Sequence, residues 1–165
     1  MEVDEVEFYR QASSIAKQSR EGKFASKTPA LLLPTEQDRL SRQEYFEALL
    51  ARIKNQKLKT RYLFSLPYLK SELNKMTPKS AEKILNWWEL LLTYKSLDIR
   101  FTETPFNPCI IGDNDVLVKE GSRRLFITAD VQKGQDISRE FSMLFKRASK
   151  SEKKDIDALR KGLGK

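Results

Sequence analysis

The feature that most constrains the fold is a series of short apolar segments between Leu97 and Asp130. Residues 97–102 alternate between apolar and polar side chains, which is the two-residue period of a half-buried strand. Three apolar runs follow at Cys109–Ile111, Val116–Val118 and Leu125–Ile127, separated by turn sequences that contain Gly112 and Gly121. Apolar runs between such turns are typical of a β-meander, so we predict a sheet that the rest of the chain supports.

Helical periodicity dominates the first hundred residues. Helices are predicted over residues 2–19, 41–53, 67–76 and 78–94, and a last one is predicted to begin at Asp136 as its N-cap. Ser41 and Glu44 match a capping box, and Thr77 precedes Pro78 as an N-cap should. Residues 20–28 are predicted to be a polar loop, residues 29–34 a short buried strand, and residues 60–66 an aromatic strand.

This order of elements predicts an α/β fold with a single mixed β-sheet flanked by helices. Early strands alternate with helices, which favours parallel pairing, whereas the late strands form a meander. A chain of 165 residues suits one such domain. We expect it to occupy residues 1–148, with residues 1–28 as an N-terminal helix and loop. Residues 149–165 are expected to form a basic C-terminal tail that frays or is mobile.

The composition excludes several kinds of chemistry. The sequence contains no histidine, which removes histidine-based triads and histidine metal sites. The single cysteine, Cys109, cannot form an internal disulfide and has no metal-ligand partners, which favours a reducing, cytoplasmic location. No apolar run approaches the roughly 20 residues of a membrane span, and residues 1–20 lack a signal peptide. We therefore expect no metal, no cofactor and no transmembrane segment.

The charge balance favours an anionic partner. The formal net charge is +8, from 31 Lys and Arg against 23 Asp and Glu. Residues 146–165 hold eight of these cations against three acids. The cations that we predict to contact nucleic acid are Lys146, Arg147, Lys150, Lys153, Lys154, Arg160 and Lys161. The alternative is a basic surface that only keeps the chain in solution.

Three segments resemble one half of the phospholipase D-like superfamily. They are residues 45–65, 97–101 and 109–118, within a likeness that covers roughly residues 30–148. The superfamily uses a catalytic His, a Lys two positions later and an Asp five positions after that. If Asp113 is aligned with that Asp, Phe106 and Pro108 occupy the His and Lys positions. Covalent catalysis of that kind needs imidazole, so the resemblance implies a non-catalytic relative.

Non-catalytic relatives of this kind are similar to the sensing domains of archaeal TrmB-type regulators and to phosphoinositide-binding domains of membrane-remodelling proteins. Both similarities imply binding in place of catalysis. No winged-helix segment is recognisable before the domain.

Cations around the degenerate signature are candidates for holding a phosphate or carboxylate. They are Arg61, Arg100, Lys119, Arg123 and Arg124. The plainer interpretation is that Arg100 faces solvent on its strand and that Arg123 and Arg124 form a solvated turn. Arg61 could equally cover apolar surface with its stem. Asp113 and Asp115 are interpreted as turn residues and not as metal ligands, and Cys109 as a packing residue.

Two functions are compatible with these patterns, and an enzyme is not expected. The first is a non-catalytic binding or regulatory domain for an anionic ligand or partner. We expect it to form a homodimer through the helix that contains Trp87 and Trp88. The alternative is a nucleic-acid-binding accessory protein that uses the basic C-terminal tail. A divergent nuclease would need a carboxylate–metal site, which the sequence does not assemble.

Overall fold

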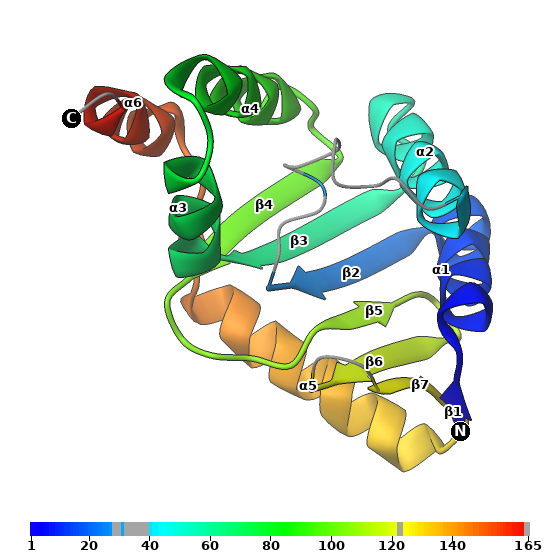
Figure 1. Cartoon of the computed structure of the whole chain (residues 1–165). Helices are drawn as coiled ribbons and strands as arrows, with labels where there is room; N and C mark the ends of the chain where they lie inside the picture. The colour runs from blue at the N-terminus through cyan, green and yellow to red at the C-terminus, as the bar shows by residue number, and fades with distance from the viewer. Residues whose placement is uncertain (28–30, 32–39, 122–123, 164–165) are drawn as a thin grey trace.

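A computed structural model describes residues 1–27, 31, 40–121 and 124–163 of the chain. Within these residues the chain forms six helices and eight strands (Figure 1). The helices are α1 (Glu5–Gln18), α2 (Leu40–Lys54), α3 (Leu66–Asn74), α4 (Pro78–Leu91), α5 (Val131–Arg147) and α6 (Lys153–Gly162). The strands are β1 (Glu2–Val3), β2 (Glu21–Ser26), β3 (Lys59–Ser65), β4 (Leu97–Thr102), β5 (Cys109–Ile111), β6 (Val116–Glu120), β7 (Arg124–Thr128) and β8 (Ser149–Lys150).

All eight strands belong to one mixed sheet, as the sequence predicts. Their order is β1-β7-β6-β5-β2-β3-β4-β8. Strands β2, β3 and β4 are parallel, β5, β6 and β7 form antiparallel hairpins, and β5 joins the two groups by pairing antiparallel with β2. Strands β2, β3, β4 and β6 therefore run in the same direction and end at one edge, called here the carboxyl edge.

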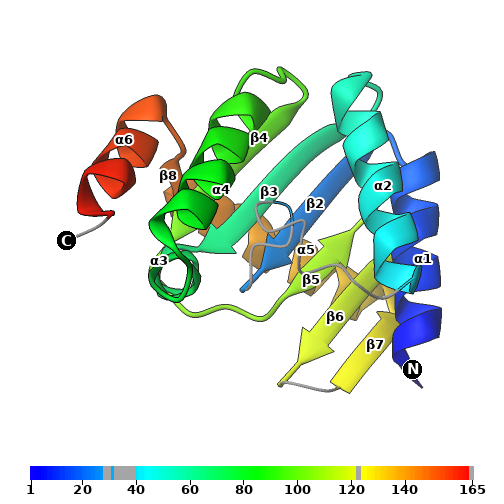
Figure 2. The same ribbon diagram turned by 45° about the horizontal axis from the view of Figure 1, so that its top comes forward.

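One face of the sheet is packed beneath α1, α2 and α4 (Figures 1 and 2). Aromatic side chains from the parallel strands form its centre, and Trp88 of α4 lies edge-on to Phe64 with ring centroids 5.4 Å apart. Burying one such side chain contributes about 1.5–3 kcal/mol, and this face holds the larger of the two apolar clusters. Trp87 donates a hydrogen bond from Nε1 to the carbonyl oxygen of Leu31 (2.8 Å).

On the other face, α5 is the one helix among the described residues that packs against the sheet, together with Phe106 of the β4–β5 connection. A second apolar cluster forms there from Leu63, Cys109, Ile111 and the stacked rings of Phe141 and Phe145, which lie 5.5 Å apart. In Figure 1, α5 runs obliquely from the hairpin strands towards the carboxyl ends of the parallel strands. The two faces are therefore covered to different extents.

The prediction of a loop over residues 20–28 is wrong for β2, which is a central strand of the sheet. Its only buried apolar side chains are Phe24 and Ala25, which are adjacent and so point to opposite faces. Lys23 occupies the position that an apolar residue usually fills in a parallel strand. The periodicity of a buried strand is therefore missing, and pairing with β3 and β5 fixes the conformation instead.

The predicted meander is confirmed for β5, β6 and β7 and is wrong for β4. Strand β4 pairs in parallel with β3, so β2 and β3 separate it from β5. The last long helix begins at Val131, and its N-cap is Asp130 in place of Asp136, since the Asp130 side chain accepts from the N–H of Lys133. The Thr77 N-cap of α4 is confirmed. The Ser41 side chain and all residues of the predicted short strand 29–34 except Leu31 lie outside the described residues.

Residues 149–165, expected to form a fraying or mobile tail, contain the strand β8 and the helix α6. Strand β8 pairs with β4, and α6 packs on α4 with Ile156 fully buried. Ile156 and Leu159 share one side of α6, an apolar signal that the surrounding charges mask in the sequence. No helix in the described ranges combines the length and apolar composition that a bilayer span requires. The predicted homodimer stays a prediction, and Trp88 is used inside the chain.

Truncating Ile156 tests whether the C-terminal helix is part of the folded domain. We expect Ile156→Ala to lower the free energy of unfolding by about 2–4 kcal/mol, because a fully buried side chain leaves a cavity. Urea denaturation measures the change, and Lys161→Ala, at an exposed position of the same helix, is the matched control. Equal stability of both variants and the parent chain would contradict the packed position of α6.

Candidate anion-binding sites

The five predicted anion-binding residues do not form one site. Arg61 and Arg100 lie on the α5 side of the sheet, because their neighbours along the strands, such as Tyr62 and Ile99, point into the core on the other side. Lys119 lies on the side of α1 and α2, next to Leu117 and Leu125 of that core. Arg124 lies on β7, near the far edge of the sheet. Arg123 lies outside the described residues.

Lys119 has the most distinctive electrostatic environment of the five. It is half-buried at the carboxyl end of β6. Burial lowers the pKa of its ammonium group, and the positive charges of Arg42 and Lys27 lower this pKa further, while Glu5 opposes them. Three cations thus gather here, and Glu5 is the acid among the groups that shift the pKa of Lys119. We call Lys27, Arg42 and Lys119 the Lys119 cluster.

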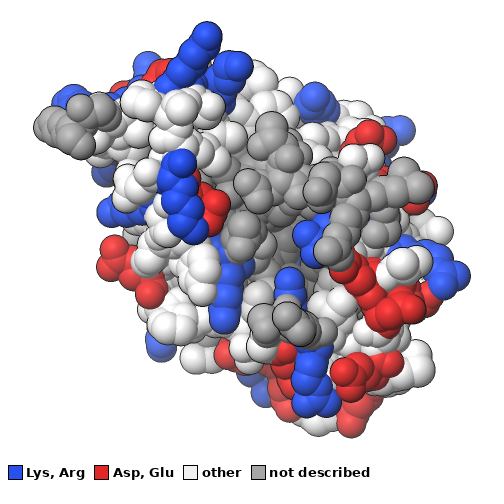
Figure 3. Space-filling view, in the orientation of Figure 1, with Lys and Arg blue, Asp and Glu red and all other residues white. Residues whose placement is uncertain are grey.

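Each member of the Lys119 cluster is held by a different element at the carboxyl edge. Lys27 directly follows β2, Lys119 is in β6, and Arg42 is in the first turn of α2. Arg42 donates from Nε to Glu5 Oε1 (2.7 Å) and lies over the ring of Tyr9, 5.3 Å from its centroid. In Figure 3, which views this side of the molecule, blue Lys and Arg side chains reach the surface near the centre, among the grey residues.

Two helix N-termini lie at the same edge of the sheet as the Lys119 cluster. Both α1 and α2 begin at this edge, so the positive ends of two helix dipoles add to the field of the three cations. Lys27 and Arg42 were not among the residues predicted from the sequence. A cation in the first turn of a helix is electrostatically unfavourable, and this signal at Arg42 could have identified it.

Arg100 is held in place by three contacts on the opposite side of the sheet. Its guanidinium donates to both carboxylate oxygens of Asp98 (3.1 and 3.2 Å) and to the carbonyl oxygen of Phe145 (3.1 Å). It also lies 4.4 Å from the centroid of the Phe145 ring. Arg61 is half-buried on the neighbouring strand β3, and it makes no hydrogen bond or ion pair with the described residues.

Arg124 belongs to the edge of the sheet. It forms an ion pair with Glu2 (3.3 Å) and lies over the ring of Phe126, 5.1 Å from its centroid. Since β1 pairs with β7 at this point, these contacts fasten the N-terminal strand.

Asp113 stabilises a turn by accepting two backbone hydrogen bonds. The N–H groups of Arg20 and Glu21 donate to its carboxylate at 2.8 and 3.2 Å. Gly112 beside it has no room for a side chain, because an added Cβ would lie 2.6 Å from Ser19 Oγ. Within the described part of the chain, no group of three or more acidic or cysteine side chains could hold a metal ion.

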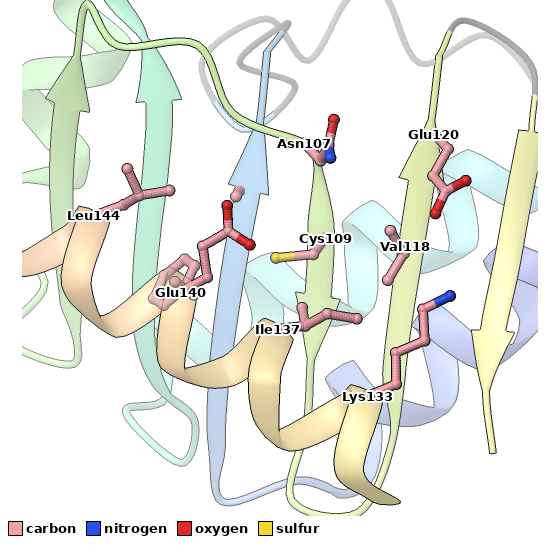
Figure 4. Close-up of a pocket in the computed structure, with 10 residues that line it drawn as sticks. Asn107, Cys109, Val118, Glu120, Lys133, Ile137, Glu140 and Leu144 are labelled. Atoms are coloured by element: carbon pink, nitrogen blue, oxygen red, sulfur yellow. The ribbon is translucent and has the colours of Figure 1, made fainter. Parts of the chain in front are cut away.

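Cys109 lines a small cavity between β5 and α5 (Figure 4). Burial raises the pKa of its thiol to about 12, and the charge of Glu140 raises this pKa too, so the thiolate nucleophile is not formed near neutral pH. The cavity volume is about 100 Å³, which is smaller than the several hundred Å³ of a typical ligand pocket.

The cations predicted for a nucleic-acid-binding tail fall into two groups. Arg160 is occupied, since it bonds Glu82, Glu89 and Asp157 and fastens α6 to α4. Lys153 and Lys154 each lie within 4 Å of a glutamate. The others form no ion pair with the described residues and are exposed: Lys146, Arg147, Lys150 and Lys161.

Comparison with known proteins shows a shared fold and no family. No protein-family model matches the sequence, and no curated protein matches it either. A solved structure of similar fold is that of TrmBL2, described as an archaeal chromatin protein that shows a novel mode of DNA binding. The TM-score is 0.60 at 12% sequence identity, over 92% of this chain and 52% of the TrmBL2 chain. The chain thus spans about half the length of TrmBL2, and at this identity the likeness concerns the fold alone.

Replacing Asp113 separates its turn role from a catalytic one. Asp113→Ala is expected to lower the free energy of unfolding by about 1–3 kcal/mol, because two backbone donors lose a charged acceptor. Chemical denaturation gives the value. Asp115→Ala, in the same turn, is the matched control and should change stability little. A phosphodiesterase activity that requires Mg²⁺ and vanishes only in Asp113→Ala would contradict the turn assignment.

Proposed function

We propose that this domain binds an anionic ligand at the Lys119 cluster and does not chemically transform it. The observation that carries the proposal is the half-buried position of Lys119 beside two further cations. Holding like charges together in a partly dehydrated site costs free energy in the unliganded protein. A bound anion would remove that cost, which is why perturbed cations concentrate at binding sites.

The chemistry of the cluster favours a phosphate or carboxylate group. Guanidinium and ammonium donors pair well with the oxygens of both groups, and helix N-termini add backbone N–H donors. A non-catalytic role is supported by the lack of histidine in the sequence. It is also supported by Phe106, which occupies the catalytic position of the resembled superfamily and is buried in the α5-side core. The phospholipase D-like kinship is part of this proposal.

A regulatory use of the site is consistent with where its parts come from. Arg42 belongs to α2, Glu5 belongs to α1, and Lys119 belongs to the hairpin strands. A ligand that contacts Arg42 and Lys119 would bridge α2 and β6, next to the Arg42–Glu5 ion pair that links α2 to α1. Ligand binding would thereby couple the helical layer to the sheet.

Nucleic-acid binding is a second candidate function. The net charge of +8 and the exposed cations near the end of α5 favour it. A DNA-binding role named for TrmBL2, whose fold this chain shares, makes the same candidate worth testing.

Thermal unfolding with sodium phosphate or sodium sulfate tests the ligand site. Both anions should raise the melting temperature of the parent chain at constant ionic strength, because they bind only the folded state. In Lys119→Met this rise should be lost. Lys95→Met removes the same charge at an exposed position and should keep the rise. An equal rise in both variants would contradict the proposal.

The pH dependence of stability gives a second readout of Lys119. The pKa of Lys119 is lowered in the folded state, so over the pH range just below the ordinary lysine value of 10.5 the unfolded chain binds more protons. Without anions, the Lys119 contribution should therefore make the parent chain more stable as the pH rises through that range. Subtracting the Lys119→Met curve isolates this contribution. A difference curve that falls over the same range would contradict the assigned environment.

A further inference from the structure

The α5 side of the parallel strands carries a row of charges that α5 covers only in part, through contacts with Lys23 and Arg100. It is formed by Lys23 of β2, Lys59 and Arg61 of β3, Arg100 of β4 and Lys150 of β8, and we call these five residues the basic half-face. All five lie on the same side of the sheet, because Lys23 pairs in register with Arg61, and Arg100 pairs with Lys150. Lys23 reaches Ser138 of α5 (3.2 Å), which confirms the side.

Such a surface is unusual for parallel strands at the centre of a sheet. Strands of this kind are ordinarily buried on both faces and carry apolar residues on both. Here α5 reaches Lys23 of β2 and Arg100 of β4, and in Figure 1 the amino ends of β3 and β4 have no helix behind them. The side chains agree, since Lys23 and Arg61 are only partly buried and Lys59 remains 63% exposed.

The charges of the half-face are only partly compensated. Its acidic neighbours are Glu21, 3.9 Å from Lys59, and Asp98, which is paired with Arg100 and lies opposite Arg61. Glu140 of α5 is a third acid on this side, since it and Lys23 both act on the Cys109 thiol. Arg61 has two cross-strand neighbours: Lys23 of β2, whose like charge is unfavourable, and Asp98 of β4, whose opposite charge is favourable. Arg61 has no hydrogen bond or ion pair within the described part of the chain, so its donors remain available to an external anion.

We infer that the basic half-face binds the phosphate backbone of double-stranded nucleic acid. Its cations lie on four adjacent strands roughly 5 Å apart, and this flat, extended array matches a polyanion with one phosphate charge per about 3.4 Å of each strand. Lys146 and Arg147 are also exposed, at the end of α5 just before Lys150 in the chain.

A duplex suits this surface better than a single strand. Single-strand sites stack bases on exposed aromatic side chains. The exposed large apolar residues of α5 are Val131 and Met143, and the half-face itself contains no aromatic residue. Contacts would therefore be made to the backbone alone, and binding would be independent of sequence.

This inference goes beyond the ligand site, because the Lys119 cluster lies on the opposite side of the sheet. The basic half-face is a different nucleic-acid-binding surface from the predicted C-terminal tail, in which Arg160 forms ion pairs with Glu82 and Glu89 of α4. Failure of one assignment leaves the other intact.

Fluorescence anisotropy with a labelled 20-base-pair DNA duplex of arbitrary sequence tests the surface. The double variant Lys23→Gln/Arg61→Gln should weaken binding at least tenfold in 100 mM KCl. It should also lower the slope of log K against log[KCl] by about 2, because each removed cation leaves one phosphate without a partner. Lys79→Gln/Lys83→Gln removes equal charge from α4, on the other side of the sheet, and should leave the slope nearly unchanged.

Two further arms keep the outcome decisive. Lys59→Glu/Lys150→Glu alters only exposed residues and should weaken duplex binding even if the first pair affects folding, which melting curves check. Lys119→Met should leave duplex binding unchanged. The inference is overturned if the half-face and α4 variants behave alike, or if Lys119→Met abolishes binding. It is also overturned if a single strand binds more tightly than the duplex, or if phosphatidylserine vesicles bind and the duplex does not.

Discussion

The structure depends on the unequal burial of the two faces of one sheet. In β2, β3 and β4, alternate side chains enter a large aromatic core beneath α1, α2 and α4, where Phe24, Tyr62 and Phe64 lie. A strand whose aromatic face is buried so completely keeps its register, because a slip by one residue would expose that face. The face of these strands on the α5 side therefore does not have to be apolar, and part of it carries charged side chains.

This inequality explains the position of both proposed sites. The Lys119 cluster lies on the densely packed side, at the carboxyl edge, where two helices begin and where ligands commonly bind in open α/β sheets. The basic half-face lies on the sparsely packed side, towards the amino ends of the same strands. The sheet separates the two sites, so one molecule could hold a small anion and a nucleic acid at once.

Sequence patterns predicted the elements that are determined by interactions between residues close together in the chain. The capping of α4 by Thr77 and Pro78, the aromatic strand at residues 59–65 and the hairpins after Cys109 were all recognisable, because adjacent residues determine them. Strand β2 was missed for the opposite reason. Its central place comes from pairing with β3 and β5, and its charged α5 face conceals the strand pattern.

The candidate sites were predicted only in part for the same physical reason. Lys119 was predicted because it follows the segment that resembles the phospholipase D-like signature. Arg42 belongs to a helix much earlier in the chain, and only the fold brings it near Lys119. Arg61 and Arg100 were both predicted as anion-binding residues, and the structure adds Lys23 through strand pairing. The C-terminal cations look alike in sequence, and only the packing of α6 shows that Arg160 holds the fold together.

The most direct test of two separate sites on one sheet is an NMR titration of the ¹⁵N-labelled chain. Sodium phosphate should shift amide signals around residues 5, 27, 42 and 119, and a DNA duplex should shift those of β2, β3, β4 and β8 on the α5 side. Each ligand should leave the other set of signals unchanged. Shifts of one common set of amides by both ligands, or duplex-induced shifts confined to α6, would contradict the division of the sheet into two binding faces.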